Sequence, residues 1–183
     1  MKSRFIILNL ALVIFLSACE STPEVSTENT FFKQGDNYDF PVNISFTYPE
    51  GWIVDDETTL KMSVRVKSAE STDSCEGPFG MVAMSMGEKS STLTFDEFVR
   101  SSKMYEEGGS MGKIGGALVQ TSLAGRYAYK ADITGWESFC EDEAYLVEVG
   151  DTDYLWIGVF TSKNNPETSG VQQILNSLLL NAD

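Results

Sequence analysis

The residues of this chain that could carry out chemistry are few, because the sequence contains no histidine. Without histidine, the Ser-His-Asp and Cys-His arrangements of nucleophilic enzymes are excluded, and so are the histidine-based zinc hydrolases. Three other sets of residues are candidates. They are a serine–lysine pair at Ser110 and Lys113, several clusters of carboxylates, and three cysteines.

The segment Ser110-Met111-Gly112-Lys113 matches the Ser-x-x-Lys pattern, in which the lysine activates the serine as a nucleophile. It lies between two glycine pairs, at 108–109 and 115–116, and not at a helix start. The Lys-Thr-Gly motif that accompanies the pattern in penicillin-recognising enzymes is missing. We therefore expect a loop that contacts other molecules at most.

Acidic residues cluster at 55–57, at 141–143 and at Asp151 with Asp153. Paired carboxylates can act as acid and base in glycosidases, and carboxylate oxygens can bind calcium. All three clusters fall in expected turns or strand ends, and no Asp-x-Asp-x-Asp-Gly loop is present. We predict no catalytic residue, metal ligand or cofactor. A hydrolase that uses carboxylates or the Ser-x-x-Lys segment and a calcium or small-ligand binding protein are the alternatives.

The N-terminus has the pattern of an export signal. Lys2 and Arg4 precede an apolar run over 5–16. A membrane-spanning helix needs about 20 apolar residues, whereas a secretory signal needs roughly 7 to 15. The following Leu16-Ser17-Ala18-Cys19 resembles the bacterial lipobox, in which the cysteine is acylated and the chain is cut before it. We expect residues 1–18 to be removed and Cys19 to carry the lipid.

The mature chain divides into a tether over 19–37 and one domain over 38–183. Residues 20–30 are polar and contain almost nothing apolar, so they cannot bury enough surface to fold alone. The lipid would hold the domain in the cell envelope. In a Gram-negative cell it would lie on the outer membrane, facing the periplasm; otherwise it would lie on the outer face of the plasma membrane. Cys75 and Cys140 then remain for a disulfide.

The chain is strongly acidic, with a formal net charge of −14. Such a surface repels phosphate groups, so nucleic acid is excluded as a partner. Contact with the membrane is expected only through the N-terminal lipid. The expected partner is an envelope protein or a small ligand.

Hydrophobic periodicity predicts an α+β domain. Apolar residues alternate over 38–48 and 60–66, and further strands are expected over 79–86, 117–123, 126–133, 144–149 and 154–162. A capping box of Thr94 and Glu97 predicts a helix from Phe95 to about Glu107. A second amphipathic helix is expected over 168–180. This succession of elements favours an antiparallel sheet with helices.

The run over 44–52, ISFTYPEGW, resembles the first strand and Tyr-Pro-x-Gly-Trp turn of PsbP-like proteins. The segment Gly125-Arg126-Tyr127, the strand with Tyr154 and the closing helix over 171–180 match that family in the same order. The resemblance implies an antiparallel sheet of about six to seven strands flanked by helices on both faces, an α/β/α sandwich. It also implies a protein without catalytic activity.

Two of the three tryptophans, Trp52 and Trp156, are expected in the core, and Trp136 is expected in an exposed loop. Trp136, Ser110 and Lys113 together are the predicted contact surface. The leading hypothesis is a lipid-anchored envelope protein that acts as a non-enzymatic accessory or binding module.

Overall fold

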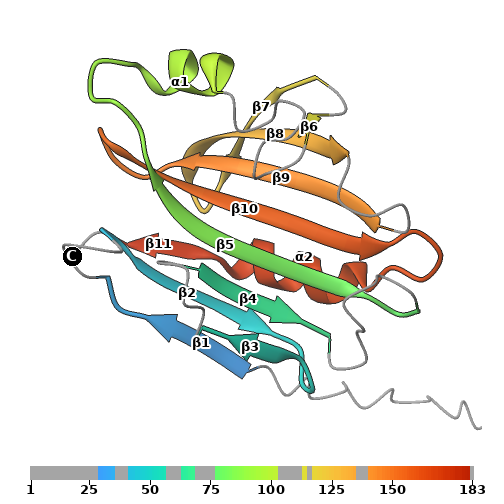
Figure 1. Cartoon of the computed structure of the whole chain (residues 1–183). Coiled ribbons are helices and arrows are strands. Elements are labelled where there is room, and N and C mark those ends of the chain that lie inside the picture. Colours follow the sequence, from blue (N-terminus) through green and yellow to red (C-terminus); the bar gives the residue numbers. More distant parts are fainter. Residues whose placement is uncertain are drawn as a thin grey trace, which may run out of the picture.

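The computed structural model describes residues 29–35, 41–56, 63–68, 77–102, 113–114, 117–134 and 140–181. These residues form strands and two helices (Figure 1). In chain order they are β1 (Asn29–Lys33), β2 (Asn43–Tyr48), β3 (Ile53–Asp55), β4 (Ser63–Lys67), β5 (Gly80–Glu88), α1 (Phe95–Ser101), β6 (Lys113–Ile114), β7 (Val119–Leu123), β8 (Arg126–Thr134), β9 (Cys140–Glu148), β10 (Asp153–Ser162), α2 (Thr168–Ser177) and β11 (Leu179–Asn181).

The strands form two antiparallel sheets. The large sheet has eight strands in the order β3-β4-β5-β10-β9-β8-β6, with β7 also paired to β8. The small sheet has three strands in the order β1-β2-β11, so it joins the first and last described strands of the chain. The prediction of a largely antiparallel sheet accompanied by two helices is confirmed.

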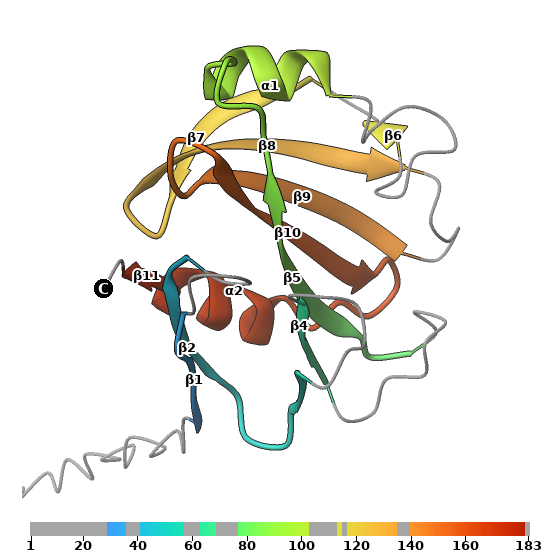
Figure 2. The same ribbon diagram turned by 60° about the vertical axis from the view of Figure 1, so that its left-hand side comes forward.

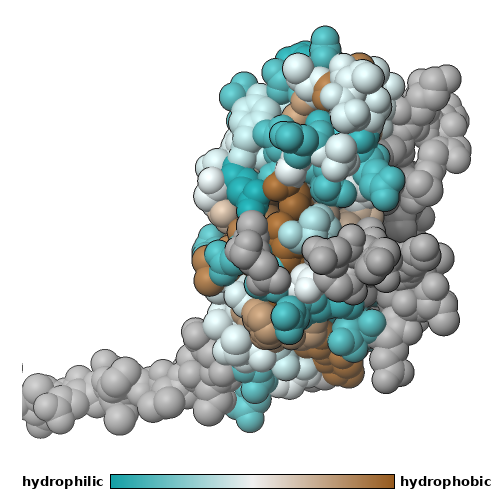
Figure 3. Space-filling view, turned by 90° about the vertical axis from the view of Figure 1, so that its left-hand side faces the viewer, coloured by the Kyte–Doolittle hydropathy of each residue, from teal (hydrophilic) through white to brown (hydrophobic). Residues whose placement is uncertain are grey.

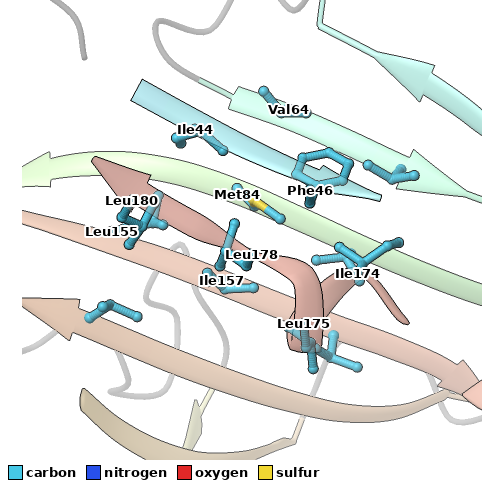
Figure 4. Packing of buried hydrophobic residues seen from close by; sticks show 14 of the residues in the cluster. Ile44, Phe46, Val64, Met84, Leu155, Ile157, Ile174, Leu175, Leu178 and Leu180 are labelled. Atoms are coloured by element: carbon cyan, nitrogen blue, oxygen red, sulfur yellow. The ribbon is translucent and has the colours of Figure 1, made fainter. Parts of the chain in front are cut away.

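The main hydrophobic core lies between the large sheet, α2 and the small sheet (Figure 4). Leu155, Ile157 and Val159 alternate along β10 and face this core together with Ile174 and Leu175 of α2. Residues two positions apart in a strand point to the same face, so this alternation aims one side of β10 at α2. Ile44 and Phe46 close the core from the small sheet.

A second, more aromatic cluster uses the other residues of β10. Tyr154, Trp156 and Phe160 belong to it, and so do Phe95 and Val99 of α1. Figure 2 shows α1 near β8 and far from α2, on the opposite side of the strands of the large sheet. Trp156 is 5% exposed, which confirms the prediction that it lies in the core.

Helix α1 begins as the sequence predicts, but it is shorter than predicted. The Thr94 side chain accepts from the Glu97 backbone N–H, and the Glu97 carboxylate accepts from the Thr94 backbone N–H, which completes the capping box. The helix ends at Ser101, because Ser102 adopts an extended backbone conformation. The remainder of the predicted helix lies outside the described residues.

Helix α2 also ends before its predicted limit. It stops at Ser177, and Leu178 has an extended backbone with φ −63° and ψ 126°. The next residues form β11, in which Leu180 pairs with Ile44 of β2. The Ser177 hydroxyl accepts from the Thr47 backbone N–H (2.8 Å), which holds the end of α2 on β2. Pairing with a strand distant in the sequence therefore replaces the last helical turn.

Strand β1 lies inside the segment that the sequence predicts as a tether. It pairs with β2 from Asn29 opposite Tyr48 to Lys33 opposite Ile44. The Phe31 ring stacks on the Phe46 ring, with the centroids 4.9 Å apart. This contact draws β1 into the sheet, so ordered structure begins before the predicted boundary at residue 38.

Trp52 also lies in the core as predicted, packed beside two glycines. It contacts the main cluster and is partly buried, with Gly80 of β5 and Gly170 of α2 directly beside its ring. A side chain at either glycine would collide with the indole.

Within the described residues, no helix has the length and apolar content that a membrane span requires.

Candidate functional site

Most of the site residues predicted from the sequence fall in parts of the chain that the structure does not describe. Cys19, Cys75, Ser110 and Trp136 lie outside the described residues. Lys113 belongs to the two-residue strand β6, opposite Thr134 of β8. Cys140 is buried at the start of β9. The disulfide between Cys75 and Cys140 and a shared surface of Ser110, Lys113 and Trp136 stay predictions.

The predicted carboxylate clusters lie on separate elements. Asp55 ends the edge strand β3, and Glu143 lies near the start of β9. Asp151 and Asp153 lie in and after the turn that follows the far end of β9. Across the described residues, no group of three or more cysteines or carboxylates is arranged to hold a metal ion.

A carboxylate and two phenols form a polar group where α1 packs on β8. The hydroxyl groups of Tyr127 and Tyr129 both donate to Asp96 Oδ1, at 2.8 and 3.0 Å. The two hydroxyl oxygens lie 3.2 Å apart. Asp96 comes from the first turn of α1, and the two tyrosines lie on one face of β8, so the group ties the helix to the sheet.

These hydrogen bonds fix the protonation states of the group. The bond from Tyr127, reinforced by that from Tyr129, lowers the pKa of Asp96 below its ordinary value of 3.8. Bonding with Tyr129 and Asp96, in that order, raises the pKa of Tyr127 far above its ordinary value of 10.0. Asp96 is therefore a carboxylate at neutral pH and Tyr127 a neutral phenol. These states suit hydrogen bonding and disfavour proton transfer at neutral pH.

Aromatic rings surround the Asp96 group. Phe95 meets the Tyr127 ring edge-on at 5.9 Å and tilts against the Tyr129 ring at 6.2 Å. Phe98 packs against Tyr154 of β10 at 4.8 Å between centroids. These contacts bury one side of α1, and its charged residues Glu97 and Arg100 remain exposed. This part of the surface is therefore amphipathic, with aromatic rings on one side of α1 and charged residues on the other.

A second polar group lies on the opposite face of β8 and β9. Lys130 Nζ is 2.7 Å from Glu143 Oε1 and 5.6 Å from the centre of the Tyr145 ring. Burial lowers the pKa of Lys130, but the hydrogen bond to Glu143 and the nearby Tyr145 raise it overall. Burial, followed by the Glu143 charge, raises the pKa of Tyr145. Lys130 is thus held as a cation paired with Glu143, and a protonated lysine cannot act as a base.

The Gly125-Arg126-Tyr127 segment has a structural use. Ala124 and Gly125 form the β7–β8 turn with φ of 53° and 71°. Arg126 then donates from Nη1 to the Val149 carbonyl (2.8 Å) and from Nη2 to the Leu180 carbonyl (3.1 Å). One guanidinium therefore connects the end of β9 to β11 of the small sheet. Tyr127 is the phenol that binds Asp96.

Comparison with known proteins rests on structure alone. No family model matches the chain, and no curated protein sequence matches it. The solution structure of cyanobacterial PsbP (CyanoP) from Synechocystis sp. PCC 6803 superposes with a TM-score of 0.53 at 16% identity, covering 89% of this chain and 97% of that one. The chain has a PsbP-like fold.

The crystal structure of LpqN from Mycobacterium tuberculosis, a protein involved in cell envelope biogenesis, has the same fold. It superposes with a TM-score of 0.54 at 9% identity, covering 85% of this chain and 92% of LpqN. At such low identity the likeness establishes the PsbP-like fold and transfers no residue role.

The Asp96 group was not predicted from the sequence. Its only signal there is the spacing of Tyr127 and Tyr129, which places both phenols on one face of a strand.

Proposed function

We propose that this protein is a lipid-anchored accessory or binding module of the bacterial cell envelope, without catalytic activity. The observation that carries the proposal is the PsbP-like fold, which is shared by LpqN, a mycobacterial protein involved in cell envelope biogenesis. The lipobox-like Leu16-Ser17-Ala18-Cys19 adds the anchor. Cys19 carries the lipid, and the domain lies on the periplasmic side of an outer membrane or on the outer face of a plasma membrane.

The polar groups of the described surface agree with binding better than with catalysis. The Asp96 carboxylate is occupied by two phenols, and Glu143 is paired with Lys130. We also infer the full α/β/α sandwich of the family. In support, α2 packs on one hydrophobic cluster and α1 on the other, and the two clusters contain alternate residues of β10, which point to opposite faces of the sheet.

The anchor is tested by labelling cells with radioactive palmitate and separating their membranes. Wild-type protein takes up label and sediments with membranes, whereas the Cys19→Ala variant does neither. Cys75→Ala serves as the matched control, because it removes a cysteine that is not acylated, and it keeps the label. A Cys19→Ala variant that still incorporates palmitate would show that the lipid is attached elsewhere.

The binding role is tested by crosslinking the native, acylated protein in intact envelopes. A binding module yields the same envelope partner in repeated captures, and the purified domain turns over no cell-wall or lipid substrate. The opposite pair of results, no reproducible partner together with substrate turnover, would favour the hydrolase. That alternative also requires Ser110 and Lys113, or two carboxylates, to act together, so their alanine variants would lose the turnover.

Binding of calcium is the other alternative and has its own measurement. A protein that binds calcium in the folded state gains stability by RT ln(1 + [L]/Kd), so its Tm rises in millimolar calcium. Magnesium at the same concentration controls for ionic strength. An unchanged Tm excludes a calcium-binding role in that concentration range.

A further inference from the structure

The outer face of the small sheet is uncharged, although the chain as a whole has a formal net charge of −14. The opposite face of this sheet carries Phe31, Ile44, Phe46 and Leu180 toward the core. Alternation sends their neighbours outward. These outward residues are Thr30, Phe32, Asn43, Ser45, Thr47, Leu179 and Asn181, and none of them is charged.

Two large apolar side chains protrude from this face. Phe32 of β1 is 62% exposed and Leu179 of β11 is 55% exposed. Both pair with Ser45 of the central strand β2, from either side. Phe32 and Leu179 therefore lie in one row across the sheet, separated by a small hydroxyl side chain. Figure 3 shows that hydrophobic residues reach the surface of the molecule in separate patches among hydrophilic ones.

The position of β1 in the chain indicates what lies next to this face. Asn29, the first residue of β1, follows Cys19 by ten positions. Ten residues span at most about 35 Å when extended, and about 17 Å on average as a flexible chain. Among the described strands, β1 is the nearest to Cys19 along the chain, so a lipid on Cys19 keeps β1 close to the bilayer. The large sheet is connected to the lipid only through the small sheet.

We propose that the outer face of the small sheet, with Phe32 and Leu179, rests on the interfacial zone of the bilayer in which Cys19 is anchored. This inference depends on the proposed lipid anchor. Apolar side chains on an amphipathic surface enter the headgroup boundary and gain free energy in proportion to the area they bury. The missing charges on this face spare it the repulsion that the rest of the acidic chain would meet at anionic headgroups.

Charge also argues against a second copy as the occupant. Two copies would meet through uncharged faces, but each chain is strongly acidic as a whole, with a formal charge of −14, and their mutual repulsion opposes association. A bilayer of zwitterionic lipid carries no such charge. The lipid anchor also raises the effective concentration of the bilayer surface near the outer face of the small sheet, without any new contact.

The test uses full-length acylated protein reconstituted in phosphatidylcholine vesicles and hydrogen exchange of the backbone amides. The reference is the unlipidated Cys19→Ala variant mixed with the same vesicles. We expect amides of residues 29–33 and 179–181 to exchange at least about tenfold more slowly in the acylated protein. The double variant Phe32→Thr/Leu179→Thr loses this slowing. Val119→Thr, which removes an equally exposed apolar side chain from β7, keeps it.

Each other result overturns the inference in a recognisable way. Acylated protein that floats with the vesicles but exchanges like the reference retains its anchor and lacks the docking. Slowing confined to other strands places the membrane contact on another face. Slowing of residues 29–33 and 179–181 that is seen only in native envelopes and never in pure vesicles assigns the face to a different occupant. Protein that fails to float removes the proposed anchor, and the docking with it.

Discussion

Replacing Gly170 by alanine should destabilise the domain, although the same change usually stabilises a helix. In a helix interior, alanine is more stable than glycine by about 0.5–1 kcal/mol. Gly170, however, is buried in the first turn of α2 against Trp52. A β-carbon there would lie 2.8 and 2.9 Å from Cε2 and Cη2 of the indole, and closer still to Cζ2.

The indole cannot easily retreat from the added methyl group. The same ring also lies close to the backbone of Gly80, where a β-carbon would lie 2.9 Å from Cη2. Overpacking of a core by one methyl group costs about 1–3 kcal/mol. Because the β-carbon would overlap three atoms of the indole, we take the upper part of this range, about 2–3 kcal/mol. After the gain in helix propensity, the net loss is about 1–2.5 kcal/mol, which lowers Tm by about 2–10 °C for a domain of this size.

The assay is urea unfolding followed by circular dichroism, with Tm from a thermal scan. Ser169→Ala is the matched control, because Ser169 is the exposed neighbour in the same helical turn and its replacement should change stability by less than about 0.5 kcal/mol. Combining Gly170→Ala with Trp52→Phe should cost less than the sum of the single changes, since the smaller ring vacates the space. Gly170→Ala at or above wild-type stability would refute the packing described for Trp52.

Three further predictions concern the polar contacts and the cysteines. Arg126→Ala should cost about 1.5–3 kcal/mol in urea unfolding, because two carbonyls lose a charged donor. The stability of Arg126→Lys should fall between those of the wild type and Arg126→Ala, since a single ammonium replaces the two-pronged guanidinium. An Arg126→Ala variant with unchanged stability would contradict the role of Arg126 in joining β9 to β11. Asp96→Asn should lower Tm at pH 7, and the difference should vanish at low pH. The folded-state pKa of Asp96 is lowered, so its stabilisation is present above pH 3.8 and is lost as the pH falls through the lowered value. Asp132→Asn, an exposed carboxylate on β8, is the control, and a difference independent of pH would exclude the charge as the cause. Alkylation of unfolded, non-reduced Cys19→Ala protein should label neither Cys75 nor Cys140, and both after reduction; labelling before reduction would disprove the disulfide.

The parts of the fold that could be predicted depend on local patterns. The capping box at Thr94 and Glu97 specifies the start of α1 through contacts within four residues. Alternation specifies which residues of β2 are buried, as Ile44 and Phe46 confirm. The β9–β10 hairpin follows from apolar strands on both sides of a short polar turn, and the observed register joins Tyr154 to Glu148.

The parts that could not be predicted depend on distant partners. Strand β11 has the apolar spacing of a last helical turn, and only pairing with Ile44 makes it a strand. Strand β1 has no alternation of its own beyond Phe31, whose partner Phe46 is in the next strand. The Asp96 group joins residues 31 and 33 positions apart. In the sequence, Asp96 looks like an ordinary residue of a first helical turn, where carboxylates are common, so nothing points to its tyrosine partners.

The arrangement of the two sheets indicates where a partner would find the domain accessible. Figures 1 and 2 both place α1 and β7 at the end of the molecule opposite β1. If the small sheet rests on the bilayer, α1 and β7 point into the envelope space. There β7 pairs only with β8 among the described strands, and its Val119 is 57% exposed. A strand edge with unpaired backbone groups can accept a strand from another protein. Crosslinks from β7 should therefore capture partners more often than crosslinks from β1, and the reverse result would place the partner on the small sheet and displace the membrane from it.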